Sequence, residues 1–166
     1  MIELDDRKFN PIRYDRVMPV EIVCHRRGKG FSSRKLKPLA LRILQLLGHE
    51  QSELTIGLIG DAEMRKLNAK FRNKDYPTDV LSFPMEQDLP GAVRLLGDVI
   101  ISVDKARRQA KERGRSLEEE FVTLLIHGVV HLLGYDHERS AKDARIMARR
   151  EKKIYRALCD QGRLRL

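Results

Sequence analysis

Apolar residues recur along the chain at two different spacings, which predict strands and helices in turn. Short runs rich in β-branched residues predict strands, and apolar positions three and four residues apart predict helices. The predicted strands cover residues 20–24, 54–59, 80–83 and 96–102, and the predicted helices cover residues 36–47, 61–71, 104–113, 116–133 and 140–158. This order indicates an α/β (α+β) fold, in which a small mixed β-sheet packs against helices.

Residues with capping preferences mark where several of these helices begin and end. Asp61 is placed as the N-cap of the helix over 61–71. The apolar stripe of this helix is predicted to contain Met64, Leu67 and Phe71. Ser116 and Glu119 have the spacing of a capping box, which starts the next long helix. We expect that helix to end where the chain turns at Gly134.

The chain has the length of one compact domain with a single core, with 166 residues of which 42% are hydrophobic. Residues 1–18 show no periodicity and are expected to be a loosely attached N-terminal extension, which leaves residues 19–166 as a single domain. No stretch approaches the roughly 18 uninterrupted apolar residues of a membrane span, and the acidic N-terminus is unlike a secretory signal. We therefore expect a cytoplasmic protein.

Positive charge dominates the composition, with 33 Lys and Arg against 24 Asp and Glu and a net charge of +9. Such a balance favours an anionic partner, either a nucleic acid or an acidic membrane surface. Charge alone does not distinguish RNA, DNA and lipid. The segment from His25 to Lys37 contains six Lys and Arg and no acid. This pattern is equally consistent with a solvated loop and with a patch that contacts phosphates.

Three of the five histidines, His127, His131 and His137, fall within eleven residues. On a helix, His127 and His131 share one face, with Cβ atoms about 6 Å apart, and can converge on one cation. A turn at Gly134 would let His137 return as a third ligand. Three neutral nitrogens leave a fourth position open, as in catalytic zinc sites. The alternative is that these are core or surface histidines that happen to lie four residues apart.

The other histidines and the two cysteines are not assigned to this site. His25 and His49 lie far from the cluster in sequence and are expected at the surface. Cys24 and Cys159 lack the C-x-x-C spacing of a thiolate metal site, and we expect them to be free thiols that are buried or partly buried.

The spacing H-x-x-x-H-x-x-G-x-x-H is also the zinc-binding pattern of the metzincin proteases. Those enzymes carry a glutamate directly after the first histidine, where it acts as the general base for the attacking water. Here that position is Gly128, which cannot accept a proton. The pattern therefore predicts a metal site but not peptide hydrolysis by that mechanism.

Four motifs make the chain similar to the YbeY endoribonucleases, which are also called rRNA maturation factors. They are residues 67–72 (LNAKFR), 77–84 (PTDVLSFP), 96–102 (LGDVIIS) and 127–137 (HGVVHLLGYDH). The resemblance implies a single-domain α/β metalloprotein with one zinc ion per chain, held at the end of a cleft. The metal ligands of the family fall on His127, His131 and His137, and its functionally important arginine falls on Arg72.

The same resemblance implies an activity and a cellular role. The expected reaction is cleavage of single-stranded RNA, in maturation of the 3′ end of 16S ribosomal RNA and in ribosome quality control. The expected partners are ribosomal RNA, the small ribosomal subunit and its assembly factors, and no membrane. The basic segments 26–37, 105–115 and 139–156 could lie along the RNA backbone. Aromatic residues make up only 5% of the chain and Trp is absent, so we expect recognition through phosphates rather than a stacking platform.

Several residues in these motifs suit phosphodiester cleavage. A zinc ion on three histidines lowers the pKa of a bound water toward ~7 or polarises a phosphoryl oxygen. The Arg72 guanidinium can bind two phosphate oxygens at once, although without the resemblance a surface salt bridge is the simpler interpretation. Asp79 and Asp136 are candidates for orienting a histidine or positioning a turn. The hydroxyls of Thr78 and Ser82 suit either phosphate contact or hydrogen bonds to loop backbone.

The residues leave two other functions open. One is a metal-dependent hydrolase of another substrate, against which Gly128 is the main evidence. The other is a non-catalytic ribosome-assembly factor in which zinc only stabilises the fold.

Overall fold

The structure is a computed structural model that describes residues 20–26, 32–85, 94–160 and 162 of the chain. The predicted N-terminal extension, residues 1–18, lies outside the described residues, and so do residues 27–31 of the basic segment 26–37. Within the described ranges, no helix is both long enough and apolar enough to cross a membrane.

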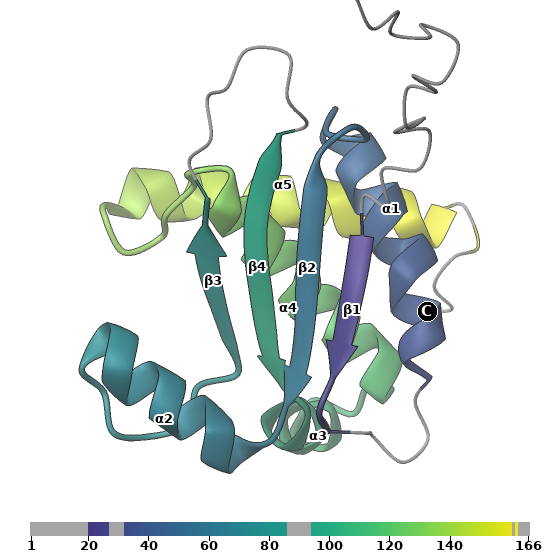
Figure 1. The fold of residues 1–166 in the computed structure, drawn as a ribbon. Coiled ribbons are helices and arrows are strands. Elements are labelled where there is room, and N and C mark those ends of the chain that lie inside the picture. Colours follow the sequence, from purple (N-terminus) through teal and green to yellow (C-terminus); the bar gives the residue numbers. More distant parts are fainter. Residues whose placement is uncertain (1–19, 27–31, 86–93, 161, 163–166) are drawn as a thin grey trace, which may run out of the picture.

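The elements follow one another in the order that the sequence predicts. The strands are β1 (Val20–Cys24), β2 (Glu53–Ile59), β3 (Val80–Pro84) and β4 (Leu95–Ser102). The α-helices are α1 (Leu36–Leu46), α2 (Asp61–Arg72), α3 (Val103–Glu112), α4 (Leu117–Leu132) and α5 (Ala141–Asp160), and a short 3-10 helix (Ser33–Lys35) precedes α1 (Figure 1). The predicted mixture of strands and helices is therefore confirmed.

One predicted cap is wrong. Asp61 is the first residue of α2 rather than its N-cap, a place that Gly60 takes. The Asp61 carboxylate is engaged elsewhere, because it accepts a hydrogen bond from Ser102 Oγ at 2.6 Å and pairs with Arg108 at 2.7 Å. Ser102 is itself the N-cap of α3, where its Oγ accepts the N–H of Lys105. The helix α3 therefore begins at Val103, one residue earlier than predicted.

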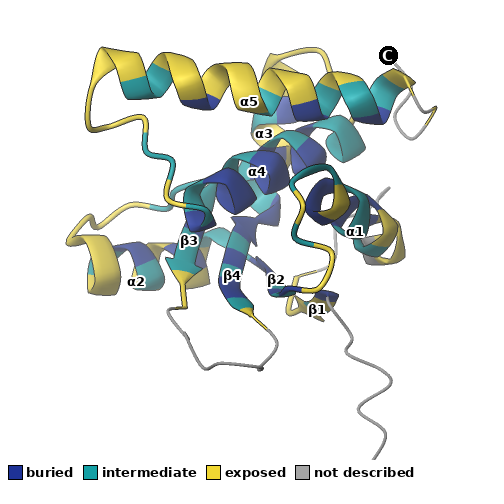
Figure 2. Ribbon diagram, turned by 90° about the horizontal axis from the view of Figure 1, so that it is seen from above, coloured by how far each residue is buried: buried dark blue, intermediate teal, exposed yellow. Residues whose placement is uncertain are grey.

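The four strands form one mixed sheet in the order β1-β2-β4-β3. β1, β2 and β4 run parallel, whereas β3 runs antiparallel to β4 and is an edge strand. Figure 2 shows α1, α3 and α4 on one face of the sheet, with α5 lying across α4 on the outside. α2 lies near the β3 edge, where its Met64 packs with Ile59 and Leu81.

Alternate residues of the two central strands form the middle of the core. They are Leu54, Ile56 and Leu58 of β2 and Val99 and Ile101 of β4. α4 packs on this surface and buries ten of its residues. Full burial of an aliphatic side chain stabilises a fold by about 1.5–3 kcal/mol. The helix that carries His127 and His131 is therefore fixed firmly to the core.

Candidate metal centre

His127 and His131 lie one turn apart on α4, as predicted, and their ring centroids are 4.6 Å apart. The helix begins at the predicted capping box. Ser116 Oγ accepts the N–H of Glu119 at 3.1 Å, and the Ser116 N–H donates to Glu119 Oε2 at 2.6 Å. The spacing of four residues brings both imidazoles to one face of α4, near its C-terminal end.

The turn after α4 brings the third histidine back toward the first two. Gly134 has a φ of +87°, a left-handed conformation that glycine adopts at little cost. The Gly134 N–H donates to His131 O at 2.9 Å. The Tyr135 N–H donates to Val130 O at 3.3 Å, and the two bonds together form a Schellman motif. His137 follows this turn, and its ring centroid lies 5.1 Å from that of His131.

Asp136 positions this turn rather than a histidine. Its Oδ1 accepts the backbone N–H of Glu138 at 2.8 Å, and its Oδ2 lies 3.4 Å from Arg139 Nε. The hydrogen bond from Glu138 is the main cause that holds the pKa of Asp136 below its usual value, and Arg139 adds to it. Of the two roles predicted for Asp136, turn positioning is the one that these contacts support.

The three histidines could hold a metal ion. His127, His131 and His137 each offer one ring nitrogen, and these atoms lie within 4.8 Å of one another. No other His, Cys, Asp or Glu of the described residues joins the group. Burial lowers the pKa of His131, and the two neighbouring imidazoles lower it further, which favours the neutral form that binds metals. Three ligands leave a coordination position for water or substrate.

Glu151 on α5 orients the first histidine. Its Oε1 lies 2.7 Å from Nδ1 of His127, which leaves Nε2 as the nitrogen for a metal. Nothing in the sequence singles out Glu151, which lies 24 positions from His127 in a largely basic helix. Only the packing of α5 on α4 brings the two side chains together. A carboxylate in this place fixes the ring orientation and strengthens the imidazole as a ligand.

Asp79 is the other carboxylate predicted to orient a histidine or position a turn. Its hydrogen bonds stabilise the turn that leads into β3. It accepts hydrogen bonds from the Gln109 amide at 3.0 Å, the Val80 N–H at 2.9 Å and the Thr78 hydroxyl at 3.2 Å. Burial disfavours its charge, but these hydrogen bonds outweigh burial and hold the pKa of Asp79 below its usual value. Thr78 and Asp79 line the same cleft as the histidines, but their contacts are those of a turn.

Gly128 lies where α4 packs tightly against β3 and β4. A Cβ at this position would lie 2.5 Å from Val99 Cγ1 and 3.1 Å from Val99 Cγ2. The carbonyl oxygen of Gly128 accepts a hydrogen bond from Ser82 Oγ at 3.0 Å, so that hydroxyl joins β3 to α4. A side chain at this position would force Val99 to move, which gives a structural reason for the missing glutamate of the protease pattern.

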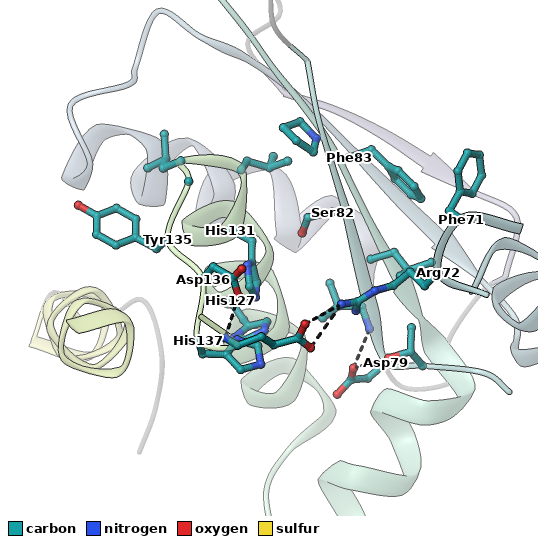
Figure 3. Close-up of a pocket in the computed structure, with 18 of the residues that line it drawn as sticks. Phe71, Arg72, Asp79, Ser82, Phe83, His127, His131, Tyr135, Asp136 and His137 are labelled. Atoms are coloured by element: carbon teal, nitrogen blue, oxygen red, sulfur yellow. Dashed lines mark hydrogen bonds and ion pairs between the residues drawn. The ribbon is translucent and has the colours of Figure 1, made fainter. Parts of the chain in front are cut away.

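Arg72 lies in the same cleft as the three histidines, a space of about 1050 Å³ (Figure 3). It is the last residue of α2, and the chain turns away at Asn73, which has a left-handed φ of 55°. Arg72 Nη2 lies 3.4 Å from each carboxylate oxygen of Glu138. An exposed pair at this distance is weak. The guanidinium is therefore accessible, and the fold brings it from α2 to the histidines on and after α4.

The residues not assigned to the site lie outside this cleft. His25 is exposed, with its Nδ1 3.7 Å from Glu63, and His49 lies just after α1. Cys24 and Cys159 are free thiols, and Cys159 is partly buried as predicted, but the prediction of burial is wrong for Cys24, which is exposed at the end of the edge strand β1.

Comparison with known proteins gives concordant matches over most of the chain. Residues 22–159 match the family model described as Endoribonuclease YbeY. The Endoribonuclease YbeY of Geobacter metallireducens is 41% identical over 148 residues, which are 87% of this chain and 99% of that protein. That of Anaeromyxobacter dehalogenans is 50% identical over 126 residues, 76% of this chain but only 64% of that longer protein. The solution structure of TM1509 from Thermotoga maritima is 29% identical, with a TM-score of 0.59 over 86% of this chain and 92% of that one.

Proposed function

The chain belongs to the YbeY endoribonuclease family, and on this premise we propose that it is a zinc-dependent endoribonuclease specific for single-stranded RNA. Its substrate in this proposal is ribosomal RNA, in maturation of the 3′ end of 16S rRNA and in ribosome quality control in the cytoplasm. Its partners are the small ribosomal subunit and assembly factors. Residues 19–166 form the catalytic domain.

The observation that carries the proposal is the meeting of three imidazoles and one guanidinium in a single cleft. Phosphodiester cleavage builds negative charge on the phosphate oxygens. A site with a cation-binding cluster on one side and an arginine on the other is arranged to stabilise that charge. Gly128 stands where the metzincin proteases carry their glutamate base, which counts against peptide hydrolysis by that mechanism.

Zinc suits the ligand set that the histidines provide. Three imidazoles with one open position are typical of catalytic rather than structural zinc. When bound, the ion would lower the pKa of a bound water and act as a Lewis acid toward a phosphoryl oxygen. The chain's own task is to hold the rings. Glu151 holds His127 by its Nδ1, and the turn at Gly134 returns His137 to the other two.

Arg72 is proposed to bind the scissile phosphate. A guanidinium can donate two parallel hydrogen bonds to phosphate oxygens. In the structure, Arg72 Nη2 lies near the two carboxylate oxygens of Glu138, which occupy the place where phosphate oxygens would bind. Because charge grows on the phosphate during cleavage, this contact is stronger in the transition state than in the ground state. Lys74, Arg94 and Arg139 also line the cleft and suit the rest of an RNA backbone.

A cleavage assay tests the proposal against the two alternative functions. The purified protein is incubated with a labelled single-stranded RNA, with the same RNA in a duplex and with casein, each with and without chelator. We expect cleavage of the single strand alone, lost with chelator and restored by zinc. Hydrolysis of casein would indicate another substrate. A zinc-loaded protein that cleaves none of the three would indicate a non-catalytic assembly factor.

The ribosomal role needs a separate experiment. Small-subunit particles that carry precursor 16S rRNA are incubated with the protein, and the RNA ends are mapped by sequencing. We expect new ends at the 3′ terminus of the mature RNA. Ends scattered over the whole RNA would contradict a specific role in maturation.

A further inference from the structure

The cleft carries exposed apolar surface as well as positive charge. Phe71, Tyr76 and Met85 are 55%, 54% and 49% exposed, and all three line it. Of the six aromatic residues in the described part of the chain, the four that line the cleft are Phe71, Tyr76, Phe83 and Tyr135. Exposed apolar side chains that gather in one place mark a binding surface. The described part of the chain has few aromatic rings, but most of them line the cleft where the RNA would lie.

Phe71 is exposed although its spacing in α2 predicts burial. Met64, on the same apolar stripe, is fully buried, whereas Phe71 lies at the end of the helix and more than half of it is open to solvent. Its ring meets that of Phe83 edge to face, with centroids 5.0 Å apart and 68° between the planes. Phe83 packs in turn against the small buried cluster of Ile59, Met64 and Leu81. The Phe71 ring is therefore supported from one side and accessible from another.

Positive charge surrounds this aromatic pair. The Lys70 ammonium lies 5.2 Å from the centroid of the Phe71 ring, and Lys74 lines the same cleft. The next residue, Asp75, is engaged by Arg65 through two hydrogen bonds of 2.7 Å, so its charge is compensated. An accessible ring among cations matches a polymer that combines flat bases with phosphates, which is a single-stranded nucleic acid.

We infer that Phe71 stacks on an unpaired base of the RNA, beside the phosphate that Arg72 binds. This inference rests on the proposed function and adds to it a residue that selects the substrate. Phe71 and Arg72 are consecutive, with Cα atoms about 3.8 Å apart, so the end of α2 can hold a base and a neighbouring phosphate together. A base in a duplex is already paired and stacked on its neighbours. Stacking on Phe71 therefore supplies a physical reason for a preference for single strands.

Single-turnover cleavage at a series of protein concentrations separates binding from chemistry. We expect Phe71→Ala to raise the half-saturating protein concentration roughly 5- to 150-fold, the usual range for loss of one stacked base. The maximum rate and the zinc content should stay near those of the wild type. Phe71→Trp keeps a flat ring and should restore binding. Ile146→Ala, which removes a 41% exposed apolar side chain from α5, is the matched control and should change neither quantity.

RNAs that lack a single base locate the contact. The panel consists of one single-stranded sequence with an abasic site at each successive position. At one position, the wild type should lose about as much affinity as Phe71→Ala loses on intact RNA. With the abasic site at that position, Phe71→Ala should lose no further RNA affinity, because the ring and the base form one contact and removal of either partner abolishes it.

The outcomes distinguish this inference from the proposed function. If the wild type cleaves RNA and Phe71→Ala has the same half-saturating protein concentration as the wild type, the stacking inference is wrong. The exposed apolar surface would then indicate a site for a protein partner. The stacking inference would also be wrong if the wild type and Phe71→Ala lost the same RNA affinity at every abasic position. A wild-type protein that cleaves no RNA would instead overturn the proposed function itself.

Discussion

The two walls of the cleft are built in opposite ways. The histidine wall (His127, His131 and His137) stands on a helix that buries ten residues, and Glu151 and the turn at Gly134 hold its rings. The arginine wall (Phe71, Arg72 and Tyr76) stands at the exposed end of α2 and in the loop after it. The only ion pair found for Arg72 among the described residues is the 3.4 Å pair with Glu138.

This difference matches the two tasks proposed for the walls, metal binding and RNA binding. A metal site needs ligand positions that do not move, so its supports reach into the core. Binding of a single-stranded RNA needs side chains that are exposed to solvent, so that bases and phosphates can displace the water around them. The residues of the arginine wall are therefore expected at the surface. Changes in the histidine wall should therefore alter metal content or stability, whereas changes in the arginine wall should alter RNA binding or cleavage and leave metal content and stability unchanged.

The largest effect is expected from His131→Ala. Two remaining ligands cannot complete a tight site, so the protein should lose most of its zinc, and cleavage should fall to background. Zinc per chain, measured by elemental analysis, and cleavage of a single-stranded RNA check this together. His25→Ala, which changes an exposed histidine outside the cleft, is the control and should keep both. Full zinc occupancy in a variant with all three histidines changed to Ala would contradict the metal assignment.

Arg72→Ala should produce the next largest effect, mainly on the cleavage rate, with only a modest drop in RNA affinity because other basic residues share the contacts to the RNA backbone. Loss of one charge-stabilising contact typically lowers the rate on the order of 10²–10³-fold. Arg72→Lys keeps the charge but loses the two parallel donors, so it should not rescue the rate. The zinc content and the thermal unfolding of both Arg72 variants should match those of the wild type. Lys66→Ala, which removes an exposed cation from the same helix, is the control and should keep the wild-type cleavage rate, zinc content and thermal unfolding.

Two results would break this assignment. Cleavage by Arg72→Ala at the wild-type rate would remove the arginine from catalysis. An unfolded protein or an empty metal site would make Arg72 a structural residue and would erase the difference between the two walls.

Gly128→Ala should lower stability rather than act on RNA directly. The new Cβ meets Val99 at 2.5 Å, and overpacking of this kind typically costs about 1–3 kcal/mol in the free energy of unfolding. Chemical denaturation measures the loss. The double variant Gly128→Ala with Val99→Ala should be more stable than the sum of the two single changes predicts, because the second change removes the clash. Strictly additive losses would show that the helix does not approach the sheet this closely.

Glu138→Gln should produce the smallest effect, in the opposite direction. Loss of the carboxylate releases the Arg72 guanidinium and removes a negative charge beside the RNA. Since exposed pairs contribute about 0.2–1 kcal/mol, RNA should bind roughly 1.5- to 5-fold more tightly. Binding measured at low salt, with Glu112→Gln on α3 as a control for the change in net charge, checks this. Weaker binding would show that Glu138 has a direct role in the site.

Local patterns were sufficient for the elements and for the histidines, because the information lies within a few residues. The spacing of His127 and His131 and the turn at Gly134 predict most of the histidine cluster without knowledge of the fold. Glu151 could not be predicted, since its role depends on how α5 crosses α4. For the same reason the local pattern is wrong about Asp61 as a cap, since its carboxylate accepts a hydrogen bond from Ser102 at the end of β4, 41 residues away.

The arginine wall shows the limit of periodicity more clearly. Phe71 lies on the apolar stripe of α2 and would be buried if the sheet extended beneath it, but the helix end passes the edge at β3. Arg72 has no distinguishing pattern of its own, and only the resemblance to a family points to it. Its place opposite the histidines follows from the tertiary fold.

Zinc titration of the metal-free protein tests the central claim most directly. Initial rates of single-stranded RNA cleavage are measured as zinc is added in fractions of one equivalent per chain. We predict a linear rise in rate that stops at one zinc ion per chain, and no rise for His131→Ala. Full activity before any zinc is added, or a rise that continues past one equivalent, would contradict a catalytic zinc held by these three histidines.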